Sequence, residues 1–161
     1  MANDLGTTTY TTPSDTEVVM ARTVAAPRTL VWDVWTNPQH VPHWLTGPDG
    51  WIMPVCEIDL HPGGLWRYVW RNPETGGELE VHGTYREVTP PHRLVTTESW
   101  GPEWPETVNV YEFAEDNGKT AITITAHYPT KTARDAAIAT GMADGMAMSY
   151  NRLADYLKEL R

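Results

Sequence analysis

The sequence predicts an α+β fold in which a curved seven-stranded antiparallel sheet wraps around one long C-terminal helix. Short runs of β-forming residues, separated by turn sequences such as HPGG and EDNG, predict a meander of antiparallel strands. Apolar residues then recur at helical spacing over 132–160, which predicts a long amphipathic helix. Because that helix must bury its apolar stripe, and the sheet is the only large partner, we expect the sheet to curl around it.

One strand and two short helices precede the meander. Alternating residues predict a strand over 17–26, and apolar residues at helical spacing predict a helix over 26–36. A second short helix is expected over 37–45, where Asn37 can cap it and Pro42 limits its length. Six further strands are expected, over 52–60, 65–71, 78–88, 93–100, 107–114 and 120–128.

The predicted C-terminal helix is about 27 residues and about 40 Å long. Thr132 followed by Asp135 resembles a capping box at its start. Gly141 and Gly145 lie inside it, although glycine destabilises a helix interior by about 1 kcal/mol relative to alanine. Small residues at these positions would leave room for a ligand or let the sheet approach closely.

Length, composition and charge limit the class of protein. The chain has 161 residues, which suits a single domain at 16–161 behind a polar, Thr-rich and disordered tail at 1–15. A formal net charge of -9 without a Lys/Arg cluster argues against nucleic acid and anionic membranes as partners. Cys56 is the only cysteine, so no internal disulfide can form. The chain starts without a signal-peptide pattern and has no apolar run of about 20 residues, so we expect a cytoplasmic protein.

The aromatic residues point to a cavity. The chain has 8 Trp and 7 Tyr but only one Phe. Trp66, Tyr68 and Trp70 occupy alternate positions and therefore share one strand face, while Arg67 and Arg71 face water on the other. The three rings either line a cavity or fill a dry core. The excess of Trp and Tyr favours the cavity, because their N–H and O–H groups need partners that a dry core lacks.

Further candidate residues lie where the same cavity would be lined or closed. Trp44 ends the second short helix, where it is either a lid over the cavity or a plug in the core. Met146 and its neighbours lie on the sheet-facing stripe of the C-terminal helix. The complete set of predicted ligand-binding residues is Trp44, Trp66, Tyr68, Trp70, Trp100, Tyr111, Met142, Met146 and Tyr150.

Glu98 and His82 are the candidate catalytic residues. Glu98 has the same strand parity as Leu94 and Trp100, and an inward carboxyl in an apolar cavity would have a raised pKa, suited to general acid or base catalysis. The alternation around His82 predicts that it faces outward, unless a bulge at Gly83 reverses it. The sequence contains no phosphate loop or dinucleotide fingerprint and no convincing set of metal ligands, so no cofactor or metal is expected.

Four segments together resemble a known superfamily. They are VWDVWTNPQHVPHWL, EIDLHPGGLWRYVWR, HGTYREVTPPHRLVTTESW and ARDAAIATGMADGMAMSYNRLADYL. The chain is similar, from about residue 17 to 160, to the START-like or SRPBCC superfamily with its helix-grip fold. The nearest branch is the bacterial one named after the activator of the heat-shock-protein-90 ATPase. Its members often carry Trp and Leu where this chain has Met146 and Tyr150.

The resemblance implies the helix-grip fold and a pocket between the sheet and the helix. Members of the superfamily bind hydrophobic ligands, or act as cyclases, dehydratases or hydrolases, and a few act as co-chaperones. The leading hypothesis is therefore a protein that binds a small hydrophobic or aromatic molecule. The alternatives are a metal-independent enzyme in the same cavity and a co-chaperone-like interaction with another protein. The sequence is also compatible with a homodimer.

Overall fold

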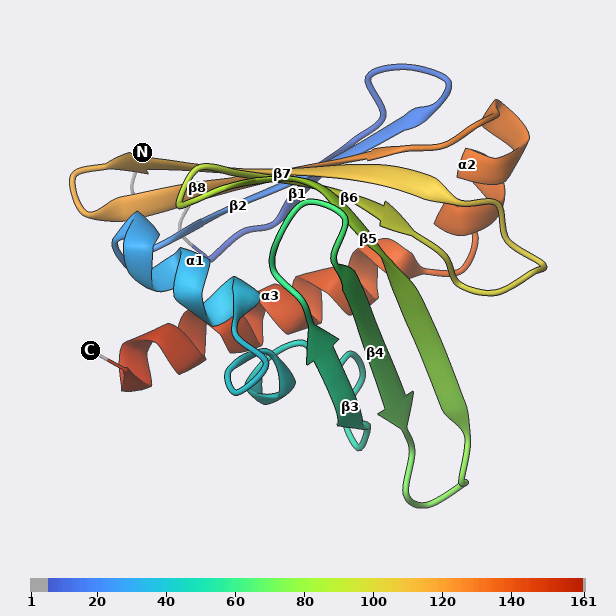
Figure 1. Cartoon of the computed structure of the whole chain (residues 1–161), viewed down its shortest axis with the longest axis horizontal. Helices are drawn as coiled ribbons and strands as arrows, with labels where there is room; N and C mark the ends of the chain where they lie inside the picture. Colours follow the sequence, from blue (N-terminus) through green and yellow to red (C-terminus); the bar gives the residue numbers. More distant parts are fainter. Residues whose placement is uncertain (1–5, 161) are drawn as a thin grey trace.

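The computed structural model describes residues 6–160 and has the predicted α+β architecture. The sheet lies against the long helix α3 (Met142–Glu159), and α1 (Arg28–Thr36) lies next to α3 on the same side of the sheet (Figure 1). The strands are β1 (Thr9–Thr11), β2 (Glu17–Val24), β3 (Ile52–Ile58), β4 (Leu65–Arg71), β5 (Glu78–Thr89), β6 (Arg93–Glu98), β7 (Thr107–Asp116) and β8 (Lys119–His127). All seven predicted strands are present, and β1 is an additional one.

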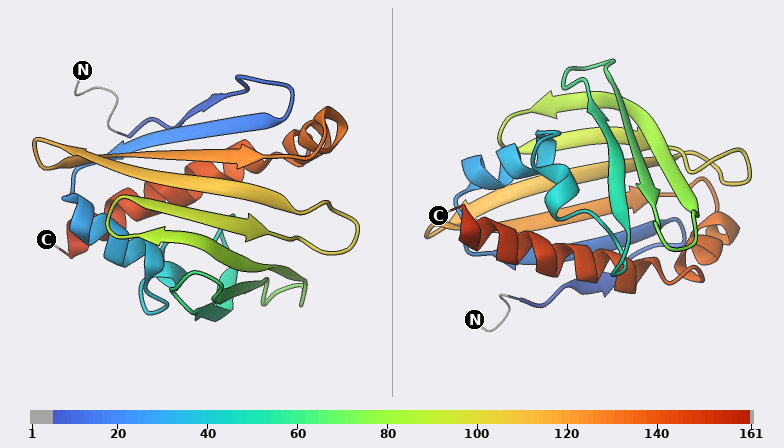
Figure 2. Two further views of the ribbon diagram at one scale, coloured as in Figure 1. Left: turned by 45° about the horizontal axis from the view of Figure 1, so that its top comes forward. Right: turned by 90° about the horizontal axis from the view of Figure 1, so that it is seen from below.

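The strand order places β1 and β3 at the two edges of the sheet. It runs β1-β2-β8-β7-β6-β5-β4-β3, and every neighbouring pair is antiparallel. Figure 2 shows α3 crossing the inner side of this sheet, with the β3–β5 end bent over towards the helix. The inner side of the sheet is therefore the side on which a site between sheet and helix must lie.

The strand β1 corrects the prediction that residues 1–15 are disordered. Its three residues pair with Val19–Ala21 at the edge of β2. Tyr10 also packs against a small hydrophobic cluster formed by Val18, Met20 and Ala126. A strand of three residues is too short to show an alternating pattern, and it forms because β2, the next strand along the chain, offers an edge for pairing. Residues 1–5 of the predicted tail lie outside the described part of the chain.

The prediction of one continuous C-terminal helix is wrong. The segment forms α2 (Lys131–Ile138) and then α3, separated by a turn. Gly141 precedes α3 with φ of 81°, a left-handed conformation that glycine adopts without a steric penalty. The cap also differs, because the Thr130 hydroxyl, and not Thr132, accepts a hydrogen bond from the backbone N–H of Ala133 at 3.0 Å.

The second short helix is reduced to one 3-10 turn, η2 (Val41–His43). The side-chain oxygen of Asn37 accepts a hydrogen bond from the N–H of Gln39 at 2.9 Å, so Asn37 forms a local turn and does not cap a helix. Pro42 has no N–H to donate and keeps the helical segment short. Trp44 follows directly after this turn and points into the protein.

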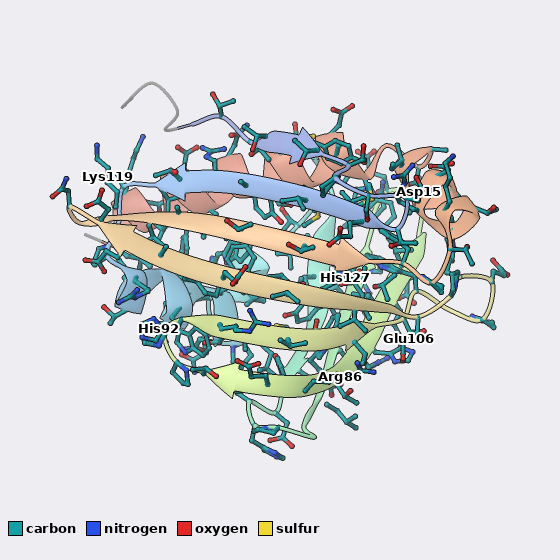
Figure 3. All side chains as sticks on the ribbon, turned by 90° about the horizontal axis from the view of Figure 1, so that it is seen from above. Asp15, Arg86, His92, Glu106, Lys119 and His127 are labelled. Carbon is teal, nitrogen blue, oxygen red and sulfur yellow. The ribbon has the colours of Figure 1, made fainter. Side chains whose placement is uncertain are left out.

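The two faces of the sheet differ in polarity. Figure 3 looks at the outer face, where Arg86 and His127 lie towards the solvent and α3 lies behind the strands. The inner face carries the main hydrophobic core, which α1 and α3 complete. No helix within residues 6–160 is long and apolar enough to cross a membrane.

Candidate functional site

A row of aromatic rings lines the inner face at the β4 end of the sheet. Trp66, Tyr68 and Trp70 alternate along β4, with ring centroids 5.0 Å and then 6.0 Å apart. Trp100, just after β6, extends the row by stacking on Trp70 at 5.7 Å with the planes 9° apart. Between them on β4, Arg67 points outward and forms ion pairs with both Glu57 and Glu80. The alternation along β4 therefore sends the rings inward.

Glu98, the last residue of β6, faces the same side as these rings. The indole N–H of Trp100 donates a hydrogen bond to Glu98 Oε1 at 2.7 Å, and the side-chain amide of Asn109 donates to Glu98 Oε2 at 2.5 Å. Burial raises the pKa of the Glu98 carboxyl, and these two hydrogen bonds oppose the rise only in part. Among the described residues, no Lys, Arg or His forms an ion pair with Glu98.

Four tyrosine hydroxyls lie close enough to Glu98 for its negative charge to raise their pKa. Burial raises the pKa of Tyr111, and the carboxylate of Glu98 adds to the rise. Burial followed by the same carboxylate raises the pKa of Tyr128 to about 12. Burial is also the main cause of the raised pKa of Tyr68 and Tyr150, to which Glu98 makes a smaller contribution. These hydroxyls therefore stay protonated at neutral pH and can donate hydrogen bonds.

The inner face near α1 is tightly packed. Trp44 and Tyr150 are each 1% exposed, and the ring of Trp35 packs against both at 4.7 and 5.8 Å. The indole N–H of Trp44 donates to the carbonyl oxygen of Val34 at 3.1 Å. The hollow at this end, which Arg22 and Trp35 help to line, is too narrow to admit a water molecule. The sequence allowed Trp44 to be either a lid over a cavity or a plug in the core. Its burial and packing show that it is a plug in the core.

The inner face away from α1 keeps part of its surface accessible. Trp100 is 36% exposed. Five further residues of the inner face and of α3 are only half-buried: Tyr68, Glu98, Tyr111, Met142 and Met146. Beside them in α3, a side chain placed on Gly145 would meet no atom within 4 Å. We define the open end as Tyr68, Glu98, Trp100, Tyr111, Met142 and Met146. Tyr111 lies at its boundary with the packed end, where its ring meets Trp35 of α1 at 5.9 Å. Trp66 and Trp70 form its buried floor, with exposures of 5% and 8%.

His82 does not join this group. It is exposed on the outer face of β5, where its register partner is Arg67 of β4. The sheet irregularity in β5 lies between Tyr85 and Glu87, so no bulge at Gly83 turns His82 inward. His82 instead borders a surface hollow of about 210 Å³ together with Leu65. Glu98 and His82, which the sequence offered as separate candidates, therefore lie on opposite faces of the sheet, and only Glu98 lies on the inner face with the aromatic rings.

Comparison with known proteins identifies the family. A family model described as Activator of Hsp90 ATPase homolog 1-like protein matches residues 25–158. This chain belongs to that family. No curated protein matches the chain.

Solved structures share the fold of this chain. A crystal structure of a protein from Rhodobacter sphaeroides is 32% identical, with a TM-score of 0.88 over 96% of this chain and 100% of that one. A crystal structure of a Nitrosomonas europaea protein is 28% identical, with a TM-score of 0.81 over 92% of this chain and 97% of that one. An AHSA1-like protein from Aeromonas hydrophila, 20% identical over 86% of this chain and 94% of that one, shares the fold with a TM-score of 0.66.

Two positions depart from the pattern that the family resemblance implied, a Trp and a Leu four residues apart in the long helix. Met146 stands at the first position and is half-buried, packed against both hydrophobic clusters. Tyr150 stands at the second, and its buried hydroxyl has no hydrogen-bond partner among the described residues. The first substitution lies in the open end, and the second lies in the packed end.

Sequence reasoning missed Asn109, which holds one oxygen of Glu98. Asn109 is buried on β7 and shares strand parity with Tyr111 and Phe113. That parity could have identified it, because a polar side chain in line with two inward aromatic residues needs a polar partner inside. The partner itself lies on a neighbouring strand, and only the register of β6 with β7 brings the two together.

Proposed function

We propose that this protein binds a small hydrophobic, partly aromatic molecule at the open end of the space between the sheet and α3. The observation that carries the proposal is the fixed position of Trp100. Its ring is stacked on Trp70 and its N–H is bonded to Glu98, yet it is 36% exposed. An indole that is held on two sides and still partly exposed is a preorganised apolar surface.

The chemistry of the surrounding side chains suits such a ligand. Met142 and Met146 are flexible and adapt to irregular shapes, while Tyr68 and Tyr111 offer rings with polar ends. Burial of apolar ligand surface would contribute about 25 cal/mol per Å². The carboxyl of Glu98 and the phenols would fix the orientation of the ligand.

Ligand titration followed by intrinsic tryptophan fluorescence tests the proposal. A panel of small aromatic molecules should quench or shift the emission of the wild-type protein, and Trp100→Ala should weaken binding about tenfold, or about 1.4 kcal/mol. Leu65→Ala is the matched control, because Leu65 is 66% exposed on the outer face and should not affect affinity. Native mass spectrometry of the protein from its producing cell would identify a retained ligand. Equal affinities for the wild type and Trp100→Ala would contradict the proposal.

A second candidate function is acid–base catalysis in the same place without a metal. The raised pKa of Glu98 favours it, because a carboxyl that ionises closer to neutral pH exchanges protons more effectively as a general acid or base. Tyr111, protonated at neutral pH, could donate a hydrogen bond to a carbonyl oxygen of the substrate. With a substrate in hand, Glu98→Gln should abolish turnover and leave binding measurable. Turnover that survives this substitution would show that Glu98 is not the general acid or base.

A further inference from the structure

Resting on the proposed function, we infer that the ligand of the open end carries an ammonium group that binds beside Glu98. The chemical class is an arylalkylamine or a similar molecule with one apolar ring and one positive charge. The inference follows from three features of the site: a carboxylate without a countercharge, unused acceptor positions on its oxygens, and a surround of aromatic rings.

The first feature is the missing countercharge. Several exposed carboxylates of this protein have cationic partners, as Asp49 has Arg152 at 2.6 Å and Glu112 has Arg93 at 3.1 Å. Glu98 is more deeply placed than these, and both of its hydrogen-bond donors are uncharged. A desolvated carboxylate without a countercharge is costly to maintain. A cation supplied by the ligand would provide the countercharge and lower the free-energy cost of keeping the carboxylate ionised.

The second feature is the remaining capacity of the carboxylate. Each oxygen of an ionised carboxylate can accept two hydrogen bonds. Trp100 uses one position on Oε1, and Asn109 uses one position on Oε2. Both donors hold the carboxylate in one orientation, so its free acceptor positions have a fixed direction. An ammonium group has three donors and can bond to this oxygen pair.

The third feature is the aromatic surround. Trp70 and Trp100 are stacked, Tyr68 meets Trp70 edge to face at 6.0 Å, and Tyr111 lies near enough to feel the charge of Glu98. Ring faces attract cations, and desolvation strengthens that attraction. An anionic ligand would meet only repulsion from Glu98, and a neutral ligand would gain a hydrogen bond without neutralising the charge. The aromatic rings and the carboxylate of Glu98 together therefore favour a ligand with a positive charge.

Three probes of one size test the inference by isothermal titration calorimetry at pH 7. They are 2-phenylethylamine, 2-phenylethanol and phenylacetate, which carry a positive, a neutral and a negative group on the same ring. The wild-type protein should bind the amine at least about tenfold more tightly than the alcohol, and phenylacetate most weakly. This comparison needs no variant. Glu98→Gln should bring the affinities for amine and alcohol together, whereas Glu106→Gln, a loss of an exposed carboxyl, should keep the preference for the amine.

The outcomes separate this inference from the proposed function. Equal binding of amine and alcohol by the wild type, or a preference that survives Glu98→Gln, overturns the ammonium site and leaves the binding function intact. If none of the three probes binds to the wild type, the proposed function fails and the inference fails with it. Tight binding of phenylacetate would show that Glu98 is protonated in the complex and would also overturn the inference.

Discussion

The two ends of the inner face use the same kinds of side chain in different ways. Near α1, the rings of Trp35, Trp44 and Tyr150 pack on one another and leave no space for water. At the open end, Trp100 is stacked and hydrogen-bonded but still partly exposed. The two ends differ in packing because different elements cover the inner face of the sheet. The helix α1 and the turn η2 fill one end, and no comparable element covers the other among the described residues. Aromatic content alone therefore does not mark a binding site.

The largest expected effect comes from the packed end. Trp35 contacts four aromatic rings, so Trp35→Ala should lower the free energy of unfolding by about 3–5 kcal/mol, through lost burial and the cavity left behind. Trp100→Ala at the open end should lower it by only about 1 kcal/mol, because that ring is already partly exposed. Urea denaturation monitored by circular dichroism measures both. Similar losses for the two variants would show that the ends are packed alike.

The next effect tests how closely the strands approach at the floor of the open end. A methyl group on Gly83 would lie 1.9 Å from the backbone oxygen of Thr97 and 2.9 Å from Trp66 Nε1. Because the oxygen belongs to the backbone, it cannot move aside cheaply. Gly83→Ala should therefore lower the free energy of unfolding by about 1–3 kcal/mol, as overpacking usually does. Thermal and urea unfolding measure the loss, and wild-type stability in this variant would mean that the sheet is looser than described.

Glycine in α3 should respond in the opposite direction. Gly145 lies in a helix, and a methyl group there would meet no atom within 4 Å. Gly145→Ala should therefore raise the free energy of unfolding by up to about 1 kcal/mol, the difference in helix propensity. A shift of the urea midpoint without a change in slope is the expected result. A loss of stability would indicate that other groups close over this part of the helix and that the open end is smaller than proposed.

The local parts of this structure could be predicted from the sequence. Turn sequences set the ends of the strands, and the alternation of Trp66, Arg67 and Tyr68 gave the inner face of β4 because a strand has a period of two residues. The same period of two in β6, where Glu98 shares parity with Leu94, predicted the inward direction of Glu98. These features depend on neighbours in the sequence, where pattern and turn chemistry carry the information.

The remaining parts depend on contacts between distant segments. The break at Gly141 could not be distinguished from a helix with an internal glycine, because glycine is compatible with both. Trp44 could be a lid or a plug, and only its packing against Trp35 and Tyr150 decides for the plug. Asn109 reaches Glu98 through the register of two strands. For Trp44 and Asn109, a partner distant in the sequence selects one of the arrangements that the local sequence allows.

The smallest predicted effect is a pH dependence of stability that arises at Glu98. Burial raises the pKa of this carboxyl in the folded protein above the ordinary value of 4.5, so the folded state binds more protons than the unfolded state between these two pKa values. The contribution of Glu98 to stability therefore falls as the pH rises through that window. Glu98→Gln cannot ionise, so the free energy of unfolding of this variant, relative to the wild type, should increase from pH 4.5 to pH 7.5. Urea titrations at several pH values, with Glu106→Gln as the control for loss of one exposed carboxyl, measure the difference. A difference that stays constant with pH would mean that solvent reaches Glu98 freely, and the open end would then be a surface feature with no buried charge to satisfy.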